Sequence, residues 1–66
     1  MVVQYYARLE VTYGASWDEV KVAYRKLMRR YHPDMHAHSP EKLKAATEVA
    51  QALTQAYNEL DKILNS

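Results

Sequence analysis

Apolar residues recur along the chain at intervals of three and four, the spacing that places them on one face of an α-helix. Over residues 40–64 these intervals alternate strictly, a heptad pattern that predicts a long helix packed closely against a neighbouring helix. A second segment, residues 16–31, also carries one apolar face. The apolar positions of the longer segment are Leu43, Ala46, Ala50, Leu53, Tyr57, Leu60 and Leu64, widened by Val49, Ala56 and Ile63, and those of the shorter one are Val20, Tyr24, Leu27, Met28 and Tyr31.

The ends of both helices carry their own signals. Ser16, followed three residues later by Glu19, fits a capping box at the start of the shorter helix. Pro33 ends that helix at about Tyr31, because proline has no N–H and pushes the residue before it out of the helical conformation. An N-cap serine and a proline at the first helical position, residues 39–40, open the longer helix.

A short helix is predicted ahead of these two. Over residues 4–10, Tyr6 and Leu9 lie three apart and share a face, which Val3 and Val11 extend. So short a helix does not persist alone in water and has to be held by the rest of the domain. The loop that follows it contains the only glycine of the chain.

Together these elements predict an all-α fold built on an antiparallel hairpin. A short loop joins the helices at about 16–31 and 40–64 and returns the chain alongside itself. The longer helix reaches roughly 37 Å and the shorter one roughly 22 Å, so the end of the longer helix overhangs, and the helix at about 4–10 is expected to cover it. Trp17 and Val22 fall outside the apolar face, and no fourth helix is evident. The covering side chains are expected to be Tyr6, Leu9 and Val11, over Tyr57, Leu60 and Leu64.

Length and composition indicate one small domain over residues 1–66. A chain of this size buries only about 60% of its unfolded surface, so the packing of helices has to supply its stability. The absence of cysteine excludes disulfides and cysteine-based zinc sites. No apolar run approaches the roughly 18 residues of a membrane span, and the N-terminus has no signal-peptide pattern. We therefore expect the cytoplasm or another reducing compartment.

Charge is unevenly distributed along the chain. The net charge is only +1, yet the predicted helix before Pro33 holds five basic and two acidic residues. Lys21, Arg25 and Arg29 lie four apart on its polar side. Lys26 and Arg30 widen this row, which we call the basic stripe. One interpretation is a solvated helix face, and the other is an electrostatic docking surface for an acidic partner. So low a net charge does not favour a dedicated nucleic-acid binder.

The bend after this helix is the candidate binding site. His32 and Asp34 flank Pro33, whose ring pre-orders the turn, so that side chains there lose little entropy on binding. Taken alone, the triplet is better explained as a helix stop whose His32 and Asp34 are merely solvated. The basic helix directly before it makes a recognition site the better explanation. His36 and His38 follow, but the spacing of the three histidines matches no structural zinc pattern. We expect no metal site, no cofactor and no catalytic residue.

From Gln4 to about Leu60 the chain resembles a J-domain, the DnaJ-like co-chaperone module. The resemblance covers most of the chain, and its most specific part is the basic helix that runs into Tyr-His-Pro-Asp at residues 31–34. The other matching motifs, in family order and spacing, are Tyr5-Tyr6 with Leu9 and Val11, Ala15-Ser16 with Asp18-Glu19-Val20-Lys21, Ala23-Tyr24-Arg25-Lys26-Leu27, and Ala56-Tyr57 with Leu60.

This resemblance implies a partner rather than a reaction. J-domains bind the seventy-kilodalton heat-shock chaperone at its ATPase domain and interdomain linker, stimulate its ATP hydrolysis and couple it to a client. The chain itself is not expected to be an enzyme, and we expect a monomer that binds neither membrane nor nucleic acid. The positions that match the family's contact residues are His32, Pro33, Asp34, Lys21, Arg25, Lys26 and Arg29.

The sequence also departs from the family pattern. Glu10 stands where the family often has glycine, and Ala50 where a core phenylalanine is common. After Leu60 the helical pattern continues, whereas the family usually breaks into a loop and a short fourth helix. Two alternatives stay open: a J-like protein-interaction module that does not stimulate the chaperone, and a small helical DNA-binding domain that uses the basic stripe against phosphates.

Overall fold

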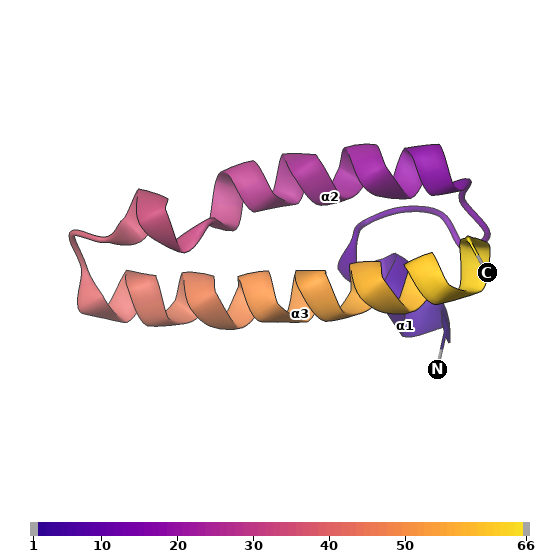
Figure 1. Cartoon of the computed structure of the whole chain (residues 1–66). Coiled ribbons are helices and arrows are strands. Elements are labelled where there is room, and N and C mark those ends of the chain that lie inside the picture. Colours follow the sequence, from indigo (N-terminus) through magenta and orange to yellow (C-terminus); the bar gives the residue numbers. More distant parts are fainter. Residues whose placement is uncertain (1, 66) are drawn as a thin grey trace.

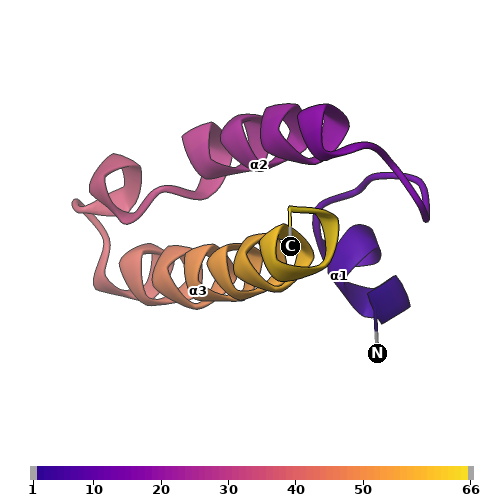
Figure 2. The same cartoon turned by 45° about the vertical axis from the view of Figure 1, so that its right-hand side comes forward.

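A computed structural model describes residues 2–65, and no strand occurs within that range. Its elements in chain order are α1 (Val2–Arg8), α2 (Trp17–Tyr31), the 3₁₀ helix η1 (Pro33–His36) and α3 (Pro40–Leu64). Helices α2 and α3 run antiparallel as a hairpin, and α1 packs beside the C-terminal part of α3 (Figure 1, Figure 2). The predicted all-α hairpin is confirmed.

The two long helices begin where serine side chains cap them. Ser16 accepts a hydrogen bond from the backbone N–H of Glu19 at 3.3 Å, and Ser39 accepts one from that of Lys42 at 3.4 Å. Each capping oxygen satisfies a helix N–H that has no partner within its own helix. The bounds predicted for these helices are confirmed, and α3 continues without a break to Leu64.

The core lies between α2, α3 and the N-terminal segment that contains α1. Val20 and Leu27 are buried on α2, whereas α3 contributes three buried alanines and two buried leucines. Alanine lets the axes of two packed helices approach closely, since the side chains at the contact set their separation. No polar side chain is buried among residues 2–65, so apolar packing holds the hairpin together.

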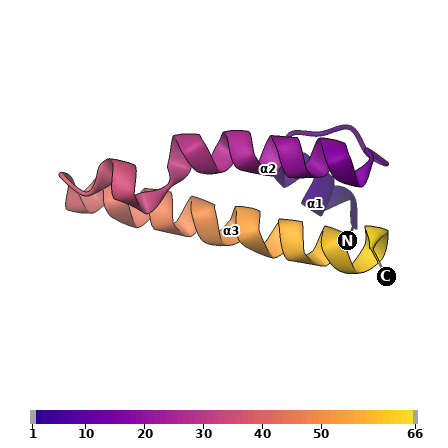
Figure 3. The ribbon, with the colours of Figure 1, turned by 45° about the horizontal axis from the view of Figure 1, so that its top comes forward.

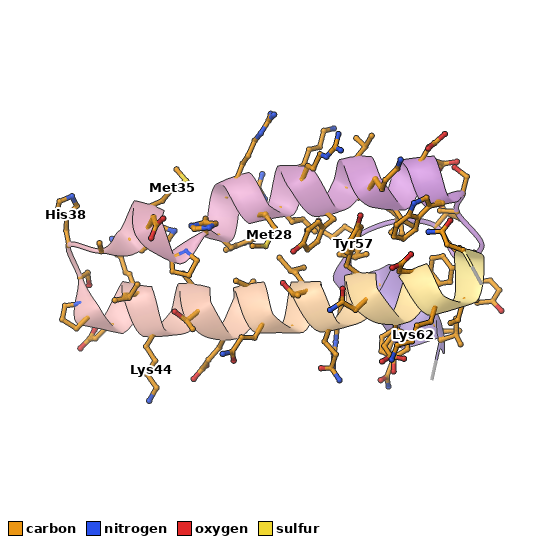
Figure 4. All side chains as sticks on the ribbon, viewed as in Figure 1. Met28, Met35, His38, Lys44, Tyr57 and Lys62 are labelled. Carbon is orange, nitrogen blue, oxygen red and sulfur yellow. The ribbon has the colours of Figure 1, made fainter. Side chains whose placement is uncertain are left out.

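Tyr57 of α3 lies against two rings of α2. Its ring centroid is 4.2 Å from that of Tyr24, in a stacked arrangement, and 4.9 Å from that of Trp17. Trp17 and Tyr57 therefore both contribute to the packing of α3 on α2. Trp17 packs against the core although it lies outside the apolar stripe, because its large ring reaches well beyond its own backbone. Tyr57 projects towards α2, as its place on the heptad stripe predicts (Figure 4).

Helix α1 begins and ends two residues before the predicted range of 4–10. Glu10 has a positive φ of 58°, and its N–H donates to the carbonyl oxygen of Ala7 at 3.0 Å. The next N–H, that of Val11, donates to the carbonyl oxygen of Tyr6 at 3.1 Å. This pair of bonds is a Schellman motif, which ends a helix at a residue in the left-handed conformation. Tyr6 of α1 packs into the core as predicted, and so do Leu9 and Val11, which follow the helix. Val3, expected to extend the same face, is instead 57% exposed.

The hairpin has two unlike ends. We call the end that contains α1, residues 17–24 and residues 53–64 the base, and the end that contains residues 28–46 the tip. The beginning of α1 and the end of α3 lie at the base, and η1 lies at the tip (Figure 1, Figure 3). The molecule extends 38 Å along the hairpin and about half of that across it. Within residues 2–65, no helix combines the length and the apolar character needed to cross a membrane.

Candidate functional site

The tip begins where α2 is stopped. His32 has an extended backbone with φ −63° and ψ 132°, because the following Pro33 disfavours the helical conformation. Pro33 then opens η1, where its missing N–H leaves no bond unmade. The sequence predicted only a loop over residues 32–39, so η1 is an addition to that prediction. Its turn is closed by the N–H of Met35, which donates to the carbonyl oxygen of His32 at 3.0 Å.

Hydrogen bonds within the turn hold the His-Pro-Asp triplet. The Asp34 N–H donates to Nδ1 of His32 at 3.2 Å, so the imidazole ring lies against the backbone of its own turn. Because Nδ1 accepts this bond, a neutral His32 ring carries its proton on Nε2. The Asp34 carboxylate lies 3.6 Å from the same nitrogen, yet its side chain is 92% exposed. The turn therefore presents a carboxylate to solvent from an ordered backbone.

His36 connects η1 to the end of α2. Its Nε2 lies 3.2 Å from the carbonyl oxygen of Arg30, one of the last carbonyls of α2, which have no partner within the helix. A ring N–H that donates there caps the helix end. Within residues 2–65, no three side chains of the ligand-forming types are gathered as a metal site would require. Both His32 and His36 are instead engaged with the backbone of the turn.

The basic stripe is divided by its surroundings. Lys21 is half-buried and forms an ion pair of 3.4 Å with Asp18, one turn earlier in α2. Arg25, Lys26 and Arg29 form no ion pair within the described residues, and their side chains face outward from α2. Their charges are therefore free to act on a partner, whereas that of Lys21 is partly compensated.

A hollow of about 420 Å³ joins part of the stripe to the triplet, between the end of α2 and η1. It brings together Arg25, Arg29 and His32, three of the predicted site residues. Lys26 instead lines a second hollow, of about 450 Å³, beside the end of α1, and Pro33 lies on a third one along α3. The residues that line the first hollow, which we call the tip hollow, are Tyr24, Arg25, Met28, Arg29, His32 and Met35.

Met28 and Met35 line this hollow but were not among the predicted site residues. Met28, assigned to the core face, is only partly buried, and Met35, assigned to the loop, is 63% exposed. Figure 4 shows Met28 between α2 and α3 and Met35 pointing outward from η1. The sequence contains a signal, an apolar residue directly after the triplet. Its meaning depends on how η1 folds back towards α2, which sequence spacing does not specify.

Known families and proteins agree with the resemblance seen in the sequence. The family model described as DnaJ domain matches residues 4–63. A Chaperone protein DnaJ of a Nitratiruptor species is 46% identical over 58 residues, which cover 88% of this chain and 14% of that protein. A Chaperone protein DnaJ of Leptospira biflexa is 46% identical over 66 residues, covering 88% of this chain and 18% of that protein.

A third relative, the Chaperone protein DnaJ of Bacillus velezensis, is 48% identical over 52 residues, covering 76% of this chain and 14% of that protein. The chain therefore spans less than a fifth of the length of each of these three relatives. No solved structure gives a significant match. The similarity concerns the helical domain alone and does not extend to the remainder of those proteins.

Proposed function

The chain belongs to the DnaJ domain family, and from this premise we propose that it is a co-chaperone module. It binds a seventy-kilodalton heat-shock chaperone, stimulates the ATP hydrolysis of that chaperone and couples it to a client. The observation that carries the proposal is the exposed Asp34 carboxylate on a turn ordered by its own hydrogen bonds, next to the unpaired charges of Arg25 and Arg29.

Binding begins with long-range attraction. The basic stripe steers the module onto an acidic surface of the partner's ATPase domain, and unpaired surface charges accelerate such an encounter when salt is low. Arg25 and Arg29 act closest to the turn, and Lys26 acts from the α1 side of α2. Lys21 contributes less, because its ammonium group is already paired with Asp18.

The triplet then fixes the position of the complex. Asp34 pairs with a basic group near the joint between the partner's ATPase domain and its interdomain linker. His32 is a positioning residue, because its ring holds the Asp34 backbone, and Pro33 keeps the turn out of the helical conformation. The module shifts the chaperone towards its hydrolysis-competent state only if it binds that state more tightly than the other. The chemistry of hydrolysis belongs to the partner.

Two other functions make different predictions. A protein-interaction module that does not stimulate the chaperone would leave its ATP hydrolysis unchanged, with or without the Asp34 charge. A DNA-binding domain would use the same exposed stripe against phosphates, and its affinity for duplex DNA would fall steeply with salt. A mobility-shift titration with duplex DNA at low and high salt tests this second alternative directly. We expect no discrete protein–DNA complex in this titration, because the charge outside α2 is net negative.

The direct test is single-turnover ATP hydrolysis by purified bacterial seventy-kilodalton chaperones, with and without this chain. We expect stimulation by the natural chain, and its loss in Asp34→Asn and in the charge-reversed pair Lys21→Glu with Arg25→Glu. Lys44→Glu is the matched control, since it reverses a charge on α3 that points away from α2 (Figure 4). Stimulation by the two site variants equal to that by the natural chain would overturn the proposal. So would a lack of stimulation by the folded natural chain across the panel.

A further inference from the structure

We propose that the tip hollow is an anchor pocket for one apolar side chain that is flanked by carboxylates in an acidic segment of the partner. This inference rests on the proposed function, because the hollow lies between the triplet and the exposed arginines of the stripe. It adds Met28 and Met35 to the interface and states what the partner's contacting segment is made of.

The walls of the tip hollow are apolar, and one of them is rigid. The Tyr24 ring is stacked on Tyr57, and its hydroxyl group shares a hydrogen bond of 3.1 Å with Thr54. The other two walls are the thioether side chains of Met28 and Met35. Methionine has three rotatable bonds and a polarisable sulfur, so it adapts its shape to the group that it contacts.

The rim of the hollow is cationic. Its positive charges come from Arg25 and Arg29, His32 lies beside them, and none of its lining residues is acidic. An apolar side chain alone would leave the two guanidinium groups without partners, whereas a bare acidic segment would leave the methionines and Tyr24 facing water. A segment that carries both kinds of group satisfies the whole lining, since charge pairs at the rim and an apolar anchor at the centre are the usual anatomy of an interface.

The size and exposure of the hollow fit this occupant. A volume of about 420 Å³ is ample for one leucine-sized side chain together with part of its backbone. Met35, at 63% exposure, has the largest apolar surface to lose at this site, so its contact with the anchor would supply much of the gain from burial. The charges would set the rate of encounter, and the anchor would set the lifetime of the complex.

Two substitutions separate the anchor from the charges. Met35→Asn removes the apolar wall but no charge, and Met35→Leu restores an apolar group of similar volume. The matched control is Val3→Asn, because Val3 is 57% exposed and lies on α1 at the base. Affinity for an ATP-bound chaperone is measured for each variant at about 50 mM and about 300 mM salt.

We expect Met35→Asn to weaken binding roughly tenfold at both salt concentrations, because burial of an apolar group does not depend on ionic screening. Met35→Leu and Val3→Asn should bind like the natural chain. Arg25→Ala should weaken binding mainly at low salt. If Met35→Asn binds as tightly as the natural chain while Asp34→Asn does not bind, the anchor pocket is rejected and the proposed function stands.

A peptide titration tests the anchor pocket without any chaperone. Acetyl-Asp-Glu-Leu-Glu-Asp-amide and its counterpart with serine in place of leucine are titrated into protein labelled with ¹³C at the methionine methyl groups. We expect the leucine peptide to shift the Met28 and Met35 methyl signals, assigned through Met28→Leu and Met35→Leu, and the serine peptide not to shift them. Equal shifts with both peptides, or no shift with either, would overturn the pocket even if chaperone stimulation is observed.

Discussion

The base and the tip of the hairpin are held together by different kinds of interaction. The three largest fully buried side chains all belong to the base. Leu9 directly follows α1, Val20 lies in the first turn of α2, and Leu60 lies near the end of α3. At the tip, η1 contains no buried residue, and hydrogen bonds of 3.0 to 3.2 Å between near neighbours fix its shape.

The difference indicates a division of labour. Apolar burial supplies most of the free energy of folding, so the base should determine stability. Exposed hydrogen bonds contribute little net free energy, but they restrict conformation, which lowers the entropy lost on binding. The tip should therefore tolerate substitutions that abolish recognition while the fold persists. Substitutions at the two ends can test this separation one by one.

The largest effect on stability is expected at the base. Leu53→Ala and Tyr57→Ala should each lower the free energy of unfolding by about 2–5 kcal/mol, since each removes a large group packed in the core. The free energy of unfolding of so small a domain is itself only a few kcal/mol, so we expect both variants to be substantially unfolded even without urea. Urea unfolding followed by far-ultraviolet circular dichroism measures the loss. A loss below about 0.5 kcal/mol for both variants would contradict the assignment of stability to this packing.

A smaller effect of opposite sign is expected at the end of α1. Glu10 has a φ of 58°, a conformation that costs a residue with a Cβ atom energy but costs glycine none. Glu10→Gly should therefore raise the free energy of unfolding by about 0.5–1 kcal/mol. Glu48→Gly removes the same side chain from an exposed position inside α3 and should lower it by about 1 kcal/mol. Destabilisation by both changes would show that Glu10 is not strained.

The smallest effect on stability is expected for the hydrogen bond that joins η1 to α2. His36→Ala removes the ring at the Arg30 carbonyl oxygen, a bond at an exposed site, and should cost no more than about 0.5 kcal/mol. The same urea titration is the measurement, with His38→Ala as a control that removes an exposed histidine of the same loop. A loss of about 2 kcal/mol or more would mean that the tip contributes to stability as the base does, and the comparison would fail.

The bounds of the long helices were predictable because their determinants are local in sequence. Ser16, Ser39 and Pro33 act within a turn of themselves, and the heptad pattern specifies the packed face of α3. The end of α1 was not predictable in the same way, because the left-handed residue there is Glu10 rather than glycine. The packing of Trp17 was not predictable, because spacing describes where a backbone lies and not how far a large ring reaches.

The candidate site was predictable only in part. The triplet and the basic stripe follow from proline geometry and from four-residue spacing. Spacing already separates Lys26 from Arg25 and Arg29, which lie four apart on one face of α2, but it does not specify how η1 folds back beside α2. That fold brings Arg25 and Arg29 to His32 and leaves Lys26 beside another hollow. Met35 acquires a place in the site only through the same tertiary arrangement, which no periodicity encodes.

The most direct test of the division of labour is a pair of measurements on Asp34→Asn, a substitution that keeps the shape of the side chain and removes its charge. The carboxylate is 92% exposed, so the unfolding midpoint in urea should match that of the natural chain. Stimulation of a seventy-kilodalton chaperone in single-turnover ATP hydrolysis should be lost. An unfolded or strongly destabilised variant would contradict the account, since Asp34 would then be a structural residue, and so would a stable variant that stimulates like the natural chain.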